Sequence, residues 1–557
     1  MKQKRSKSAG LKRKAPHREE KQFVSSWISS GLLIPLLLIL AGIVWYGFFA
    51  IHTNDVSGSD DREYASVARN IVNGKGIVRN FVYPIDINFF AKLPVPEFMH
   101  PPGYPLIIAG FFKLFGVSDR AAVLPSYLSY FILVILFFYF TKTYLELGTA
   151  VLATVILIFS KVILDVSIVA LSEAVYTLFF FLFFMVFIKA NSLGDIFLAG
   201  ILLGASHLIR ENIYPFLIPL FAFLYFYPDL PRSKKMIFFA LGILVPILPN
   251  ILRSYIDTGS PSFSYGKFVL MAFTEKYPGL SIYRDIQNPS LVDFLREVPG
   301  QIFIKYLSNL VNTFKEILSN FNPCLLVFFI LEMFYWKVNP AYKRIKILFL
   351  SLFVSQILFI CLFTSTHRFF IPFLPMMIVF ASESVWKLSN ILAAQVKVHW
   401  RRGILLLGRF AFLMFLIVPT AHLIVTSKGP PQLGFKIPQT FYLMPREEAK
   451  KLIRFLDEEL KKDKVVWTDL PEVLEWEGNR FCGWLPTRIE TIYEIDKKIP
   501  VDAILITNFG TTVRPLGEGW KELLRSEQSL PHFRNVKRYT RWPIFAKLLV
   551  RDEKNKQ

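Results

Sequence analysis

Long apolar runs recur along this chain of 557 residues, and they constrain its fold more than any other feature. A helix needs about 20 apolar residues to cross a bilayer. We count about 11 candidate runs, so the sequence predicts an all-α polytopic membrane bundle. The candidates are 27–51, 121–141, 149–165, 173–189, 195–210, 212–228, 236–253, 322–336, 346–364, 369–390 and 403–426. A composition with 53% hydrophobic residues argues against a single soluble core, for which about 45–50% is usual.

The net charge of +22 is the kind of charge that nucleic-acid-binding proteins carry, but its distribution argues against that class. Nine of the first 21 residues are Lys or Arg, and further basic clusters lie in short loops between the apolar runs. Such loops face the cytoplasm. The sequence therefore predicts a multi-pass protein of the cytoplasmic (inner) membrane with a cytoplasmic N-terminus, the lipid bilayer as partner and no nucleic acid.

Charge and hydropathy also divide the chain into predicted domains. The last 130 residues hold 24 Lys or Arg and 19 Asp or Glu, a far higher density of charge than in the rest of the chain. Lys428-Gly429-Pro430-Pro431 resembles a linker. Within the tail, 445–462 is patterned as an amphipathic helix, and 464–467 and 502–507 as buried strands. The predicted domains are a basic, unstructured cytoplasmic tail (1–22), a transmembrane domain (23–427) with a first outside loop (52–120), and a small extracytoplasmic α/β domain (428–557).

The first outside loop carries a short amphipathic pattern with two adjacent acids. Apolar residues recur with helical spacing from Tyr64 to Ile71, and Asp60 and Asp61 stand at the start of that helix, which we expect to lie along the membrane surface. Ser59 or Asp60 is a suitable N-terminal cap. A purely structural explanation is that both carboxylates only cap the helix and complement its dipole.

The same loop ends in the segment Met99-His100-Pro101-Pro102-Gly103-Tyr104-Pro105, followed by an apolar run. Three prolines and a glycine predict a rigid turn that leads the chain back to the membrane, with His100 at its edge.

In this order, Asp60-x-x-Glu63-Tyr64 followed by His100-Pro101-Pro102-Gly103-Tyr104-Pro105 resembles the first outside loop of polytopic glycosyltransferases of the GT-C superfold. The branch is the one that includes bacterial aminoarabinose transferases of lipid A and protein O-mannosyltransferases. Weaker similarity extends to Ser172-Glu173, to Gly200 through Arg210, and to His367-Arg368-Phe369-Phe370-Ile371-Pro372. The resemblance implies a polyprenyl-phosphate-linked sugar donor and an essential acid in this loop.

The predicted topology places seven polar residues at outside span ends or in outside loops, and polar groups there are costly unless they share a cavity. These are Asp60, His100, Glu173, Arg210, Arg253, His367 and Arg368. Each also has a structural explanation, such as a helix-start acid for Glu173 or pairing of Arg210 with Glu211. With Glu63, Tyr64 and Tyr104, they form the predicted cavity.

Transfer of a sugar from such a donor needs a base for the acceptor and cations for the leaving phosphate. The resemblance makes Asp60 the catalytic base, with Asp61 second, and implies inversion at the anomeric carbon. We expect Arg210 and Arg368, assisted by His367, to bind the donor phosphate. A divalent metal ion held by Glu63, His100, Glu173 or His367 is left open, since no ligand spacing marks a site.

The acceptor is equally open, because nothing in the sequence selects among a glycolipid, a polysaccharide and a protein. A transporter or flippase of lipid-linked glycans is the main alternative of another class, although transporters place their sites near the membrane midplane. A third alternative is an assembly protein whose tail binds partners.

Overall fold

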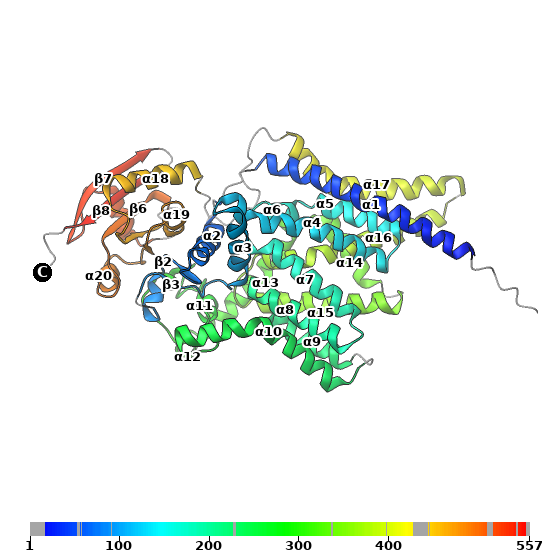
Figure 1. Ribbon diagram of the computed structural model, residues 1–557, viewed down its shortest axis with the longest axis horizontal. Coiled ribbons are helices and arrows are strands. Elements are labelled where there is room, and N and C mark those ends of the chain that lie inside the picture. Colours follow the sequence, from blue (N-terminus) through cyan, green and yellow to red (C-terminus); the bar gives the residue numbers. More distant parts are fainter. Residues whose placement is uncertain are drawn as a thin grey trace, which may run out of the picture.

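The computed structural model describes residues 17–52, 56, 58–90, 92–226, 230–335, 338–396, 398–426, 444, 446–509, 516–541 and 544–552. It has two parts, each with its own apolar core. One is a bundle of long helices, and the other is a mixed α/β part built around a sheet (Figure 1). The predicted linker at 428–431 lies outside the described residues.

The bundle consists of helices whose apolar residues pack in one continuous core. They are α1 (His17–Ala50), α4 (Asp119–Tyr144), α5 (Leu147–Ile158), α6 (Lys161–Ser167), α7 (Ser172–Lys189), α8 (Leu193–Ile209), α9 (Tyr214–Phe226), α10 (Arg232–Thr258), α14 (Pro323–Phe334), α15 (Pro340–Ile360), the 3-10 helix η3 (His367–Phe373), α16 (Leu374–Ala394) and α17 (Val398–Thr426). Many outward side chains are also large and apolar, as expected for helices that face lipid.

Among the described residues, six helices are long and apolar enough to cross a membrane, and up to eight if each bent pair counts as one span. The predicted count of eleven is therefore not confirmed. The predicted spans 195–210 and 212–228 are the shorter helices α8 and α9, and 149–165 is broken into α5 and α6, which meet at 54°. Helix α15 is absent from the six, and its first turns carry Lys343, Arg344 and Lys346.

The first helix also differs from its predicted bounds. Helix α1 begins at His17, inside the segment predicted as an unstructured tail, and only the first 16 residues of that segment lie outside the described residues. Its apolar stretch from Leu32 to Ala50 is one of the six candidate spans. The basic residues from Arg18 to Lys21 are therefore the first turn of a continuous helix.

The α/β part contains two segments that join bundle helices, together with the tail. The first segment forms α2 (Ser59–Val72), β1 (Val78–Arg79), β2 (Phe81–Val82), η1 (Pro84–Asn88), β3 (Val95–Pro96) and α3 (Gly103–Phe115). The second forms α11 (Gly266–Met271), η2 (Ser281–Arg284), α12 (Leu291–Glu297) and α13 (Gln301–Asn320). The tail forms α18 (Arg446–Glu459), β4 (Val466–Thr468), α19 (Pro471–Trp476), β5 (Cys482–Trp484), α20 (Thr491–Asp496), β6 (Ala503–Thr507), α22 (Glu518–Arg525), β7 (Phe533–Arg541) and β8 (Ile544–Arg551).

The tail does not complete its sheet alone. The six strands lie in the order β2-β5-β4-β6-β8-β7, and the edge strand β2 comes from the first loop, nearly 400 residues earlier in the chain. Strands β2, β5, β4 and β6 are parallel, whereas β8 and β7 are antiparallel. Phe81 and Val82 are fully buried, so the first loop contributes to the core of the tail. The predicted amphipathic helix and both predicted strands are present as α18, β4 and β6.

Helix α2 lies between the tail and the bundle (Figure 1). Its side toward the tail carries polar residues that contact α19: the Ser59 hydroxyl donates to Glu472 (2.8 Å), and Arg69 donates to the carbonyls of Glu475 and Trp476 (2.5 and 2.8 Å). Its apolar side packs on α3. The predicted surface helix is thus present but buried, and its N-cap is Gly58 in place of Ser59 or Asp60.

Glu475 gives this interface a predicted pH dependence. Its Oε1 accepts from the backbone N–H of Asn80 (2.6 Å), and burial raises the pKa of the carboxyl from its ordinary 4.5 to about 8. Because the folded pKa is raised, the stability of the protein falls as pH rises from 4.5 through 8. We expect Glu475→Gln to be as stable as wild type at pH 5. At pH 9 we expect its free energy of unfolding to be higher by a few kcal/mol, the amount that a pKa shift of this size implies. Thermal unfolding at both pH values measures this.

The matched control is Glu490→Gln, which changes an exposed glutamate of the same tail and should leave the pH profile as in wild type. An equal effect of Glu475→Gln at pH 5 and pH 9 would contradict the assignment.

Candidate active site

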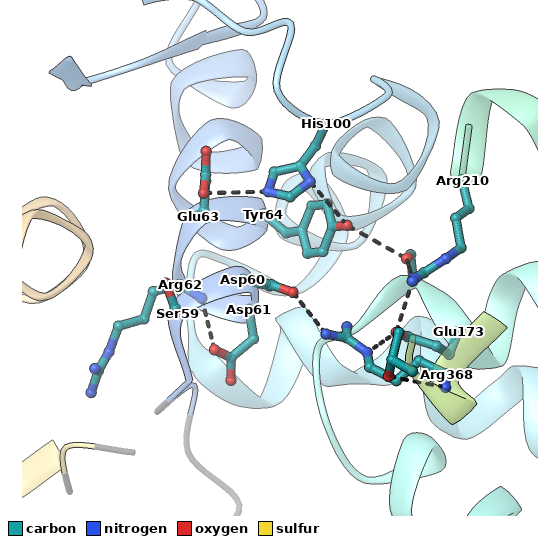
Figure 2. Close-up of polar contacts among 12 residues, drawn as sticks. Ser59, Asp60, Asp61, Arg62, Glu63, Tyr64, His100, Glu173, Arg210 and Arg368 are labelled. Atoms are coloured by element: carbon teal, nitrogen blue, oxygen red, sulfur yellow. Dashed lines mark hydrogen bonds and ion pairs between the residues drawn. The ribbon is translucent and has the colours of Figure 1, made fainter. Parts of the chain in front are cut away.

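Four elements bring charged residues together where the bundle meets α2 (Figure 2). Asp60 lies in the first turn of α2, and Glu173 lies in the first turn of α7, where the helix dipole favours an acid. Arg210 is the C-cap of α8. Arg368 lies in η3, whose N-terminus is capped by the Thr366 hydroxyl. Residues more than 300 positions apart in the sequence therefore meet at one place.

Glu173 is the centre of this cluster. Its Oε1 accepts from Arg368 Nε at 2.5 Å and from Arg210 Nη1 at 2.9 Å. Arg368 Nη1 also reaches Asp60 Oδ2 at 3.1 Å, so one guanidinium bridges the two carboxylates. The Glu173 side chain is buried at 1% exposure, while those of Asp60 and Arg368 are each 21% exposed. The buried acid holds two cations, and the partly open side of the cluster is formed by Asp60 and Arg368.

The cluster is balanced in charge, because two carboxylates face two guanidinium groups. The guanidinium of Arg210 also lies 4.5 Å from the centre of the Phe369 ring, and its Nε is buried without a hydrogen-bond partner. A buried donor of this kind is costly unless a ligand or water satisfies it. An incoming anion would find the donors of both arginines already oriented by Glu173.

Tyr64 and His100 extend the site along α2. The Tyr64 hydroxyl lies 3.5 Å from both the Ser172 hydroxyl and His100 Nδ1, and His100 Nε2 lies 3.3 Å from Glu63. Burial lowers the pKa of His100, but the Glu63 carboxylate and its hydrogen bond outweigh this effect, and with Glu97 and Asp60 they raise it to about 9. At neutral pH this histidine is therefore a cation.

The two adjacent acids of α2 point in different directions. Asp61 Oδ1 accepts from the backbone N–H of Arg62 (3.0 Å) and lies close to Gly58, whereas Asp60 points toward Arg368 (Figure 2). Tyr104 packs edge to face behind Tyr64, and its hydroxyl lies 3.2 Å from that of Ser126. The sequence alone left the choice between Asp60 and Asp61 open, and the structure brings only Asp60 to the arginine cluster.

Two further predicted cavity residues make other contacts. His367 Nδ1 lies 3.1 Å from Glu316 on α13. His367 is therefore next to Arg368 in the sequence, but its side chain is directed at another helix. Arg253 donates to the backbone carbonyl of Glu97 (2.8 Å) and stacks on Phe98, so it braces the first loop.

The sequence alone did not identify three residues that contact the site, Glu97, Phe369 and Glu316. Glu97 accepts from the backbone N–H of His100 (2.7 Å), and its spacing of three residues from His100 was an available signal. Phe369 lay within the segment that showed similarity. Glu316 stands on a separate loop, and nothing in its local sequence connects it to His367.

Close packing of α3 against α8 explains the glycine of the Pro-Pro-Gly turn, Gly103. A Cβ atom at this position would lie 2.5 Å from the carbonyl oxygen of Leu208, on the last turn of α8 before Arg210. We expect Gly103→Ala to force α3 and α8 apart, to reduce activity, and to destabilise the protein by about 1–3 kcal/mol, as overpacking does.

Gly110→Ala is the matched control, because it lies on the same helix and a Cβ there meets no atom within 4 Å. Thermal unfolding and transfer assays compare the two variants. Equal behaviour of both would refute the close-packing explanation.

The divalent metal ion considered in the sequence stays a prediction. Among the residues that the structure describes, no group of three or more His, Cys, Asp or Glu side chains is arranged to hold an ion. Of the predicted ligands, Glu63 contacts His100, Glu173 contacts arginines, and His367 contacts Glu316.

Comparison with known proteins shows which family and which fold the chain is similar to. Residues 99–252 match the family model of dolichyl-phosphate-mannose-protein mannosyltransferases. Over almost its whole length, the chain also has the fold of the ArnT structures from Cupriavidus metallidurans: the apo form superposes with a TM-score of 0.55 at 11% identity, covering 94% of this chain and 98% of that one. The chain is similar to polytopic glycosyltransferases in part of its sequence and in its fold over almost its whole length. The resemblance found in the sequence is thereby confirmed.

Two further structures show the same fold. ArnT from Cupriavidus metallidurans bound to undecaprenyl phosphate superposes on this chain with a TM-score of 0.52 at 10% identity, and the match covers 93% of this chain and 98% of ArnT. The archaeal oligosaccharyltransferase AglB from Archaeoglobus fulgidus, in complex with an inhibitory peptide and a dolichol-phosphate, gives a TM-score of 0.51 at 10% identity and covers 95% of this chain and 75% of AglB. No curated protein sequence matches the chain.

Proposed function

We propose that this protein is a glycosyltransferase that moves a sugar from a polyprenyl-phosphate-linked donor to a glycolipid, polysaccharide or protein acceptor. The reaction takes place on the outer face of the cytoplasmic membrane and inverts the anomeric centre. The observation that carries this proposal is the cluster in which Glu173 holds Arg210 and Arg368 beside Asp60. Each charge in that cluster has a use in such a transfer.

The arginines suit the phosphate of the donor. When the bond between the anomeric carbon and the phosphate oxygen breaks, the electron pair leaves with the phosphate, which gains negative charge. Guanidinium groups bind phosphate oxygens through oriented N–H donors and keep their charge at any working pH. Glu173 fixes Arg210 and Arg368 before the donor binds, so little reorganisation is needed during the reaction.

Asp60 is positioned to take the proton of the acceptor. The acceptor hydroxyl or amine attacks the anomeric carbon, and its proton passes to a carboxylate within hydrogen-bond reach. In the structure Asp60 Oδ2 already accepts a hydrogen bond from Arg368. A donor phosphate that binds Arg368 competes with this contact and releases the carboxylate for the acceptor. Donor binding would thus activate the base.

The solved structures support a lipid-linked donor. ArnT was crystallised with undecaprenyl phosphate and AglB with a dolichol-phosphate, and both share this fold. AglB also holds a peptide, which keeps a protein acceptor among the candidates.

The arrangement favours an enzyme site over a transport pathway. The charged residues gather at the start of α7, at the end of α8 and in η3, whereas transporters place substrate sites near the midplane between broken repeats.

Mass spectrometry of envelope glycans and glycoproteins from cells with and without the protein tests the proposal and identifies both sugar and acceptor. We expect one sugar modification to disappear with the protein and to return with wild type but not with an Arg368→Ala variant. Identical glycan profiles in all three strains would contradict the proposal.

A further inference from the structure

Helix α13 exposes an apolar stripe. Large apolar residues point outward at positions that fall within about 100° of one another around the helix, given 100° per residue. Phe303 is 64% exposed and Phe314 51%. The stripe consists of Phe303, Ile304, Leu307, Val311, Phe314 and Leu318.

The opposite side of α13 is polar and faces the protein. Lys305 donates to the carbonyls of Val269, Leu270 and Ala272 at 2.7–2.9 Å, where it caps the end of α11. Asn309 donates to the carbonyl of Cys361 (3.0 Å) one turn later. In a water-exposed helix the apolar side faces the core, so α13 has the reverse polarity. Such a pattern is stable only where the surroundings of the stripe are apolar.

The direction of α13 excludes a simple transmembrane role. The chain turns by 115° between α13 and α14, and α14 packs along α16, which belongs to a candidate span. Helix α13 is therefore steeply inclined to the bundle, at the junction with the α/β part (Figure 1). Its twenty residues include Lys305, Lys315 and Glu316, a polar content typical of interfacial helices.

We propose that α13 lies in the plane of the membrane, in the leaflet next to the active site, with its stripe in the lipid hydrocarbon. Helices of the bundle such as α10 also expose large apolar residues, so the stripe has the same apolar character as the surface that faces lipid. Charge on the inward side keeps the helix at the interface, because Lys305 and Glu316 are held by protein groups there.

This placement connects the bilayer to the site. Glu316 contacts His367, the residue before Arg368, so α13 is in direct contact with the 3-10 helix that carries this arginine. The inference does not depend on the proposed reaction, because it rests on exposure, polarity and helix direction alone.

Photo-crosslinking of the full-length protein in phospholipid vesicles tests the proposal. The photoreactive residue p-benzoylphenylalanine replaces Phe314 in one variant. Two matched variants carry it at Leu244, an exposed residue of α10, and at Glu522, an exposed residue of α22 in the tail. Intact-protein mass spectrometry then detects phospholipid adducts, and gel electrophoresis detects crosslinked dimers.

We expect lipid adducts at positions 314 and 244 and none at 522. Two results would overturn the proposal: adducts at 244 without adducts at 314, or a crosslinked dimer at 314 in place of lipid, which would assign the stripe to a second copy of the chain. The crosslinking experiment does not measure activity, so a failure of the proposed function would leave the inference about α13 intact.

Discussion

Replacement of Asp60 by asparagine is expected to reduce glycosyl transfer by about 100- to 10,000-fold, the range that general base catalysis contributes. The amide keeps the size of the side chain and an oxygen that can accept from Arg368, but it cannot take the acceptor proton. Folding and donor binding should persist, because Glu173 still holds both arginines. The measurement is the initial rate of transfer by purified protein, with the binding of polyprenyl phosphate as a second readout.

Asp61→Asn is the matched control for this variant. Its carboxylate accepts from the Arg62 backbone and points away from the arginine cluster, so we expect transfer to continue at a rate close to wild type. Loss of transfer in Asp61→Asn with full activity in Asp60→Asn would reverse the assignment of the base.

Replacement of Glu173 by alanine is expected to have the second largest effect, on stability as well as activity. It leaves Arg210 and Arg368, whose side chains are 15% and 21% exposed, without their shared carboxylate. Removal of one partner from a buried ion pair typically costs about 3–5 kcal/mol, and the partial exposure of the arginines places this case near the lower end. Thermal unfolding in detergent and the transfer rate are the measurements.

Glu211→Gln provides the comparison, because it removes the acid next to Arg210 in sequence. Glu211 accepts from the Tyr214 hydroxyl at 3.3 Å, while Arg210 pairs with Glu173. We expect little change in transfer. If Glu211→Gln proved as damaging as Glu173→Ala, the pairing seen in the structure would be wrong.

The sequence predicted the class of fold because apolar runs report directly on lipid contact. It predicted the number of spans less well, since α8 and α9 are apolar yet only 17 and 13 residues long, and length is set by tertiary packing. It also treated the tail as separate. The two residues of β2 are too short to be recognised as a strand, so the pairing of Phe81 with Cys482 was invisible before the fold was known.

For the site, the sequence predicted the residues but not the contacts between them. The residues Asp60, Glu173, Arg210 and Arg368 were all named from topology and family resemblance, because each stands at a span end or in an outside loop. Their partners could not be named, since Arg368 contacts Asp60 across 308 residues of sequence. The local sequence offered Glu211 as an alternative partner of Arg210, and only the packing of α7 against α8 brings Glu173 to this arginine.

The central claim is that this cluster transfers a sugar from a polyprenyl-phosphate donor. Its most direct test is the release of polyprenyl phosphate, measured by mass spectrometry, when purified protein in vesicles meets a set of polyprenyl-phosphate sugars with an extract of envelope acceptors. We expect release from at least one donor by wild type and a loss of at least about 100-fold in Asp60→Asn. Equal release by wild type and Asp60→Asn, or no release by wild type from any donor in the set, would contradict it.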